Sequence, residues 1–263
     1  MKIVQWTSII SLLLFVGYAC DSGVKSEVNE NDSSVSSRPL PENDEAEKYV
    51  YELDNKELQV GNSLYYSKED GSMVEVEIFA NDSSQVVKMV EEYTKGSSGS
   101  IERNIFYYKD NRKYVTKEYF ESKAGELTNF VERVTYYDNK GKAKVSKMRI
   151  ALYEDLLENE SFKVITAKDC SDKRAYKVLN QVDEFETTFQ GFVQVEHLTY
   201  LIVGENKRDG YSSSLIVQEK TPVIQKLLSN EKAMLGKPLV VEYEKHIGEM
   251  GFEFQALLSV DFK

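Results

Sequence analysis

Cysteine, histidine, proline and tryptophan are scarce in this chain of 263 residues, which has 2 Cys, 2 His, 4 Pro and 1 Trp. Two cysteines cannot form the disulfide framework of a small secreted scaffold. Two histidines without a His-x-x-x-His spacing argue against a zinc hydrolase. The chain also lacks a P-loop, a dinucleotide-binding glycine fingerprint and a Gly-x-Ser-x-Gly elbow. We therefore predict no metal, no cofactor and no catalytic residues.

Basic residues are too few to balance the acidic ones, with 33 Lys and Arg against 44 Asp and Glu and a net charge of −11. A negative chain repels polyanions, so we expect no nucleic-acid partner. Aromatic residues, by contrast, are abundant, with 17 Tyr and 12 Phe. Because aromatic and β-branched residues favour strands, the composition predicts an all-β protein.

Long apolar runs are absent too. The apolar segment over residues 9–16 contains Ser11 and is too short to span a bilayer, which needs about 20 apolar residues. It matches the h-region of a secretory signal. The segment ends at Ala19 and Cys20, and polar, acidic sequence follows at once.

The Ala19-Cys20 junction resembles the lipobox of bacterial lipoproteins, although Gly17 stands where that family prefers Leu. The resemblance implies that residues 1–19 are a cleaved signal peptide and that Cys20 is the lipidation site. Two or more acyl chains hold a protein firmly at a membrane. The alternative is an ordinary signal cleaved near Ala19. Once Cys20 is acylated, Cys170 has no partner, and we interpret it as a small buried hydrophobe.

Residues 20–47 contain few apolar side chains and far more acidic than basic residues. Such a segment cannot bury enough apolar surface to fold, so we predict an acidic disordered tether. An acidic stretch directly after the acylated cysteine also resembles the surface-export signals of lipoproteins in the Bacteroidetes.

Residues 48–165 are predicted to form an antiparallel β-meander domain. Three similar segments, 63–79, 105–120 and 134–150, each contain a Tyr-Tyr pair near the start, which is followed by polar turn residues and an alternating run. We expect one wet face and one buried face, with one tyrosine of each pair on each face. An aromatic binding platform is the alternative interpretation of these pairs. Residues 85–94 are predicted as a strand, with a helix as the alternative.

A connector over 166–186 is predicted to lead to a second domain at 187–263. We expect strands at 188–197, 198–204, 211–219, 238–246 and 252–262, and a helix that begins at Thr221-Pro222. In the last strand, we expect one face to be shared by Phe252, Phe254, Ala256, Leu258, Val260 and Phe262. The order of three strands, one helix and two strands resembles the OB-fold, a five-stranded barrel. A small α+β sandwich of the same order is the alternative.

Ligands of OB-folds lie across the second and third strands and the flanking loops. The resemblance therefore implies a candidate ligand groove. Its residues would be Tyr200, Lys207, Arg208, Tyr211 and His246.

Together these features predict a membrane-anchored envelope lipoprotein that acts as a non-enzymatic binding or assembly module. We expect it in the bacterial cell envelope, at the periplasmic or surface face of the outer membrane, where lipidated Cys20 would contact the membrane. The sequence leaves the partner unknown among proteins, lipids and glycans. The alternatives are an envelope hydrolase with a site between the two β-domains, and a lipid carrier.

Overall fold

Strands dominate the computed structural model, which describes residues 44–124, 127–248, 251 and 253–263. The chain is therefore mostly β, as predicted, with several short helices. The predicted signal peptide, Cys20 and the tether as far as residue 43 lie outside the described residues. In the part of the chain that the structure describes, no helix is long and apolar enough to cross a membrane.

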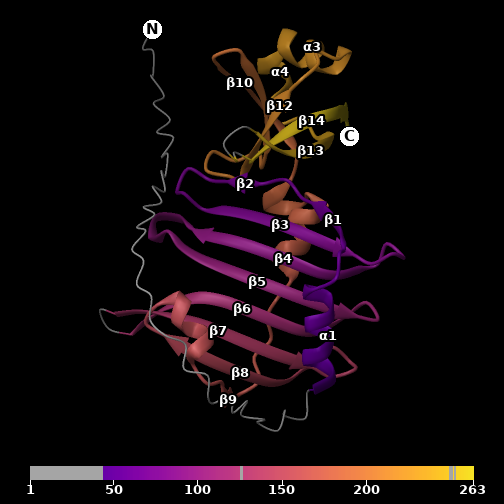
Figure 1. Ribbon diagram of the computed structural model, residues 1–263. Helices are drawn as coiled ribbons and strands as arrows, with labels where there is room; N and C mark the ends of the chain where they lie inside the picture. The colour runs from indigo at the N-terminus through magenta and orange to yellow at the C-terminus, as the bar shows by residue number, and fades with distance from the viewer. Residues whose placement is uncertain (1–43, 125–126, 249–250, 252) are drawn as a thin grey trace, which may run out of the picture. The chain divides into compact units, whose positions relative to one another are not determined.

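From β3 (Met73–Ala80) to β9 (Lys163–Ile165) the strands pair antiparallel with their neighbours in sequence, and Figure 1 shows them side by side in that order; we call this part of the sheet the meander. The strands between them are β4 (Val86–Lys95), β5 (Ser100–Lys109), β6 (Arg112–Ala124), β7 (Leu127–Tyr137) and β8 (Ala143–Ala151). The turn chemistry is local: Asp110 and Asn111 have φ of 53° and 59°, and Gly141 has φ of 74°. Asn, Asp and Gly tolerate such angles, which tight hairpins require. The strand prediction for 85–94 is correct.

A helix, α1 (Asp44–Asp54), packs on one face of the meander (Figure 1). The sequence prediction missed it, because residues 44–47 were assigned to the tether and 48 onward to strands. Ala46, Val50 and Leu53 recur at helical spacing and are buried against the sheet. The helix α1 thus has a narrow apolar face within a mostly acidic sequence, and the sequence prediction did not recognise it.

The opposite face is covered by the connector, which contains α2 (Lys173–Asn180) and η3 (Asp183–Phe185). Cys170 and Val178 are buried there against Phe106 and Tyr108, so the interpretation of Cys170 as a small buried residue is confirmed. A further turn of 3-10 helix, η2 (Glu154–Asn159), contacts β7 and β8.

The expectation of one wet face is therefore wrong for the middle of the sheet. Tyr107 and Tyr108 are both buried, and so are Tyr136 and Tyr137. Adjacent strand residues do point to opposite faces, but here α1 covers one face and the connector covers the other.

The predicted C-terminal elements are confirmed, with end points that differ by at most two residues. They are β10 (Thr188–Val195), β11 (Leu198–Gly204), β12 (Ser212–Val217), α3 (Pro222–Ser229), β13 (Leu239–Ile247) and β14 (Glu253–Phe262), and a short helix α4 (Glu231–Met234) follows α3. The Thr221 side chain accepts a hydrogen bond from the Ile224 N–H, as an N-cap should.

These strands do not stand apart from the meander. β10, β11 and β12 pair antiparallel, β12 runs parallel to β14, and β14 pairs antiparallel with β13. A bridge between Thr188 and Pro238 joins β10 to the residue before β13. At its other end, β12 pairs with β2 (Tyr66–Ser67), which pairs with β3, and β1 (Gln59–Asn62) also pairs with β3.

All strands thus belong to one open mixed sheet, and a separate barrel is not confirmed. The reason is that β12 pairs at Ser212 with Ser67 of β2, and β2 pairs with β3, so the C-terminal strands continue into the meander sheet. One hydrophobic core accordingly includes Val76 from the meander and Leu201 and Leu215 from the C-terminal strands.

One predicted strand face is also wrong. Leu258 is exposed, whereas its neighbour Leu257 is buried. The ladder shifts register between Glu242 and Tyr243, which pair with Ser259 and Leu257. This β-bulge leaves Leu258 without a cross-strand partner and breaks the alternation of side chains.

Candidate ligand cleft

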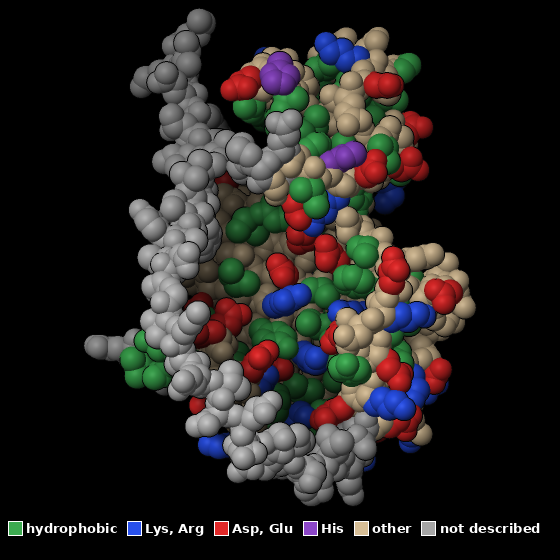
Figure 2. Space-filling view, viewed as in Figure 1, with side chains coloured by type: hydrophobic (Ala, Val, Ile, Leu, Met, Phe, Trp, Pro, Cys, Tyr) green, Lys and Arg blue, Asp and Glu red, His purple; other side chains and the backbone are tan. Residues whose placement is uncertain are grey.

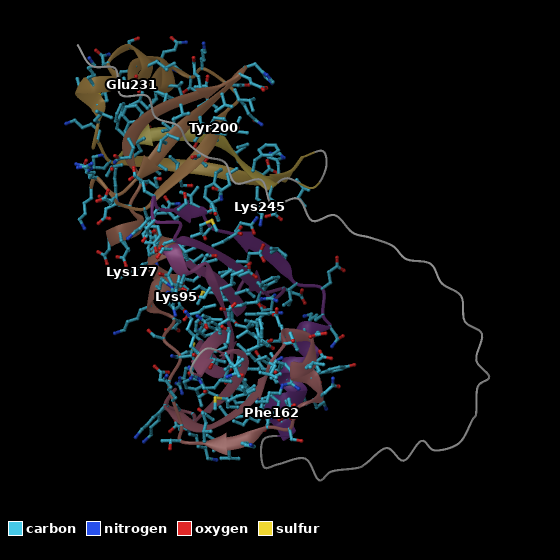
Figure 3. The ribbon with its side chains drawn as sticks, turned by 90° about the vertical axis from the view of Figure 1, so that its left-hand side faces the viewer. Lys95, Phe162, Lys177, Tyr200, Glu231 and Lys245 are labelled. Atoms are coloured by element: carbon cyan, nitrogen blue, oxygen red, sulfur yellow. The ribbon has the colours of Figure 1, made fainter. Side chains whose placement is uncertain are left out.

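A cleft opens where β12 changes partner. Ser212 pairs with Ser67 of β2, whereas Ile216 and Val217 pair with β14. Between these two points β2 and β14 diverge, and a cavity of about 480 Å³ lies beside them. It is lined by Tyr65, Ser67, Glu75, Tyr200, Ser213, Ser214, Ile216, Lys245, Glu253, Phe254 and Gln255. Figure 3 labels two of these residues, Tyr200 on β11 and Lys245 on β13.

The buried side chain of Gln255 bridges the strands that diverge. Its Oε1 accepts hydrogen bonds from the Tyr65 N–H at 3.2 Å and from the Ser213 hydroxyl at 3.3 Å. Its Nε2 donates to the Ser63 carbonyl at 3.1 Å. Because both ends of the amide are bonded, this wall of the cleft is polar but satisfied.

Lys245 forms the charged part of the cleft. Its Nζ lies 2.8 Å from Glu75, 2.8 Å from Glu253 and 3.5 Å from Glu77. Burial lowers the pKa of Lys245, but hydrogen bonds to Glu253 and Glu75 outweigh burial and hold the pKa above its usual value. Three carboxylates thus surround one ammonium group, and two negative charges are left uncompensated.

Three aromatic rings line the cleft beside these charges. Tyr65 is 37% exposed, and Tyr200 and Phe254 are half-buried. Burial, with a smaller effect of the nearby Glu75 carboxylate, raises the pKa of Tyr65, so its phenol stays neutral. The ring of Phe254 stacks on His246 with centroids 5.3 Å apart and 17° between the planes.

Three hydroxyl groups in the cleft are available to a ligand. The side chains of Ser67, Ser214 and Tyr200 make no hydrogen bond to another described residue. The Ser213 hydroxyl, by contrast, is occupied by Gln255. The cleft can therefore offer hydroxyls, aromatic faces and carboxylates, but not a free amide.

The structure places the five residues of the predicted groove at different sites. Tyr200 lines the cleft, and His246 lies beside it through its contact with Phe254. Lys207 and Tyr211 line a different hollow that also contains Lys68, Asp183, Glu184, Glu186 and Glu205. Arg208 is exposed and lines neither.

Tyr211 is drawn into the core by its neighbours. It is 7% exposed, its ring centroid lies 4.7 Å from that of Phe185, and the Lys68 Nζ lies 4.1 Å from the same centroid. Phe185 belongs to the connector, so the sequence of the C-terminal strands alone carries no signal of this contact.

Sequence analysis missed most of the cleft. Tyr65, Glu75, Glu253 and Phe254 come from strands and loops far apart in the chain, and Tyr65 lies 190 positions from Gln255. Glu75 and Glu77 alternate with buried valines and so are typical of a wet strand face. Only the pairing of β12 with β2 and β14 brings them to Lys245.

Comparisons with known proteins add no relative: no family model matches the chain, and neither a curated protein nor a solved structure matches it.

Proposed function

We propose that this protein is a membrane-tethered, non-enzymatic binding module and that its ligand site is the cleft between β2, β12 and β14. The observation that carries the proposal is the cavity of about 480 Å³, which is lined by three aromatic rings and by hydroxyls that bond no other described residue. Ligand sites are typically concave and largely apolar, with a few convergent polar groups.

The lipobox-like junction at Cys20 supports a lipid anchor, and the acidic segment after it supports a tether between lipid and folded body. In this proposal the acyl chains hold the protein at the cell envelope, at the outer membrane. The tether sets its reach, and the cleft recognises the partner.

We further infer that the C-terminal strands are an OB-like barrel merged with the meander. The order of pairing β10–β11–β12–β14–β13, with the Thr188–Pro238 bridge back to β10, supports this relationship. The backbone bonds from Phe189 N–H to the Lys237 carbonyl and from Leu239 N–H to the Thr187 carbonyl strengthen that bridge. The cleft involves β11 and β12, the strands on which OB-folds bind their ligands.

The lining residues favour binding over hydrolysis. None of them is a histidine, and the hydroxyl of Ser213 donates to an amide and not to a base. Lys245 is held as an ammonium by its carboxylates, which leaves it no lone pair for proton abstraction.

Site-specific photocrosslinking in the native envelope tests the proposal. A photoreactive phenylalanine analogue replaces Tyr200 in the cleft or, as a control, Tyr51, which is 68% exposed on α1. We expect a discrete adduct from position 200 that is absent from position 51. Equal adducts at both positions, or none at position 200, would contradict a ligand site in the cleft.

A further inference from the structure

We infer that the cleft binds a lysine or arginine side chain of an extended peptide segment, an inference that rests on the proposed function. Charge is the first reason. Glu75 and Glu253 line the cleft with Lys245, and Glu77 lies 3.5 Å from the same ammonium, so carboxylates outnumber ammonium groups at the site. An anionic ligand is repelled there, and the net charge of −11 steers cationic ligands toward the chain.

The available carboxylate is that of Glu253. Its side chain is 52% exposed, whereas that of Glu75 is 22% exposed. One carboxylate has about four acceptor positions, so Glu253 can accept from a ligand while it keeps Lys245. A hydrogen bond between a cationic donor and a carboxylate is about twice as strong as a neutral one.

The aromatic rings suit the same ligand group. Tyr65 and Phe254 line the cavity together with Glu253. A cation over an aromatic face is attracted by the ring quadrupole, and the aliphatic stem of Lys or Arg packs on apolar surface. Rings beside a carboxylate are therefore complementary to the stem and the head of a basic side chain.

A neutral glycan fits less well. Sugar recognition needs several free polar groups in fixed positions, and the amide of Gln255 already bonds Tyr65, Ser213 and Ser63. The hydroxyls that remain belong to Ser67, Ser214 and Tyr200. A few hydroxyls suffice for the backbone groups of a peptide.

The gap in the ladder beside β12 indicates that the ligand is extended. On this side β12 pairs with β2 only at Ser212 and with β14 only at Ile216 and Val217. Among the described residues, Ser213, Ser214 and Leu215 therefore have no strand partner toward the cleft. Of these three residues Ser213 and Leu215 are buried and Ser214 is exposed, so an extended ligand can reach β12 at Ser214 while the pocket receives one of its side chains.

Peptide titration of the full chain in detergent tests the inference. The probes are acetylated and amidated heptapeptides, identical except for a central Lys, Arg, Gln or Glu, and binding is measured by calorimetry. We expect the Lys and Arg peptides to bind about tenfold more tightly than the Gln peptide, and the Glu peptide to bind weakest. Glu253→Gln should remove the preference for Lys and Arg.

The matched control is Glu244→Gln, which makes the same charge change on the adjacent strand. Glu244 is exposed, pairs with His246 and does not line the cleft, so the preference should remain. Peptide binding that is indifferent to the central residue would overturn the inference, as would binding of neutral oligosaccharides in place of peptides.

The two proposals fail in distinguishable ways. If position 200 gives an adduct but basic peptides are not preferred, the proposed binding function is supported and the inference of a cationic ligand is wrong. If neither the adduct nor peptide binding is observed, the proposal of a ligand site in the cleft is wrong.

Discussion

Arg174 of α2 and Glu91 of β4 form a two-pronged ion pair between residues 83 positions apart. The guanidinium Nε lies 2.8 Å from Oε1 of Glu91, and Nη2 lies 3.0 Å from Oε2. The Glu91 side chain is 1% exposed, and the guanidinium also lies 3.9 Å from the centre of the Tyr93 ring. The pair therefore holds the connector against the face of the sheet opposite α1.

Arg174→Ala should destabilise the fold strongly. Among the residues that the structure describes, the variant leaves the buried Glu91 carboxylate with the Asn104 amide as its only hydrogen-bond partner. Removing one partner of a buried ion pair costs about 3 kcal/mol or more, so the free energy of unfolding in urea should fall by that amount.

The control for this variant is Arg103→Ala, since Arg103 and Glu92 form a pair on the neighbouring positions with both side chains more than half exposed. An exposed pair contributes at most about 1 kcal/mol. Equal losses in the two variants would show that burial of Glu91 is not what makes its pair important.

Acid should weaken the attachment of α1. Burial raises the pKa values of Glu47 and Asp54, but their partners outweigh burial and lower both pKa values. At Glu47 these partners are Lys147 and Tyr136. At Asp54 they are Lys88 and Lys117. A carboxyl group whose pKa is lower in the folded state than in the unfolded state stabilises the fold at pH values above its unfolded-state pKa. We therefore expect stability to be lost as the pH falls below their ordinary values of 4.5 and 3.8. Figure 2 shows acidic and basic side chains intermixed on one face.

The measurement is urea unfolding at a series of pH values for the natural chain and for Asp54→Asn. The variant should be less stable at neutral pH and should lose less stability on acidification. Glu52→Gln is the control, because Glu52 is exposed on α1 and pairs loosely with Lys48. An unchanged acid response of Asp54→Asn would contradict the role of this carboxylate.

Gln255→Leu should destabilise the junction at the cleft. The Ser63 carbonyl, the Tyr65 N–H and the Ser213 hydroxyl each lose the partner described above. A buried polar group left unsatisfied costs about 1–3 kcal/mol, so we expect a loss of at least about 2 kcal/mol in urea unfolding. Gln194→Ala, at an exposed position of β10, should change stability by less than about 0.5 kcal/mol.

Cys20→Ser tests the lipid anchor. Serine has no thiol to acylate, so the variant should lose label from radioactive palmitate and leave the membrane fraction. Cys170→Ser serves as the control and should keep the label, because Cys170 is buried in the core. A Cys20→Ser protein that remains in the membrane and still carries palmitate would show that the lipobox-like junction is not the anchor.

Local chemistry made much of the strand pattern predictable. The hairpin at Asp110-Asn111 and the helix that begins after Thr221 depend on conformations that neighbouring residues impose, so the sequence identifies them without knowledge of the fold. The strands on either side follow from alternation of apolar and polar residues, which is also a local property.

The candidate site was accessible to prediction only through Tyr200. Its other charged and aromatic residues gather where β12 leaves β2 and joins β14, and local sequence carries no information about which strand edge pairs with which. Tyr211 shows the same limit, since its place in the core depends on Phe185 from the connector.

The sequence by itself determined most of the strands and the turns, because these depend on backbone preferences and apolar spacing over a few residues. Only the tertiary structure decided which faces are buried. Covering both faces of the meander placed both Tyr107 and Tyr108 inside, and the bulge in β14 turned Leu258 outward. The cleft also depends on the tertiary structure, because it lies where β2 and β14, from distant parts of the chain, pair with the same edge of β12.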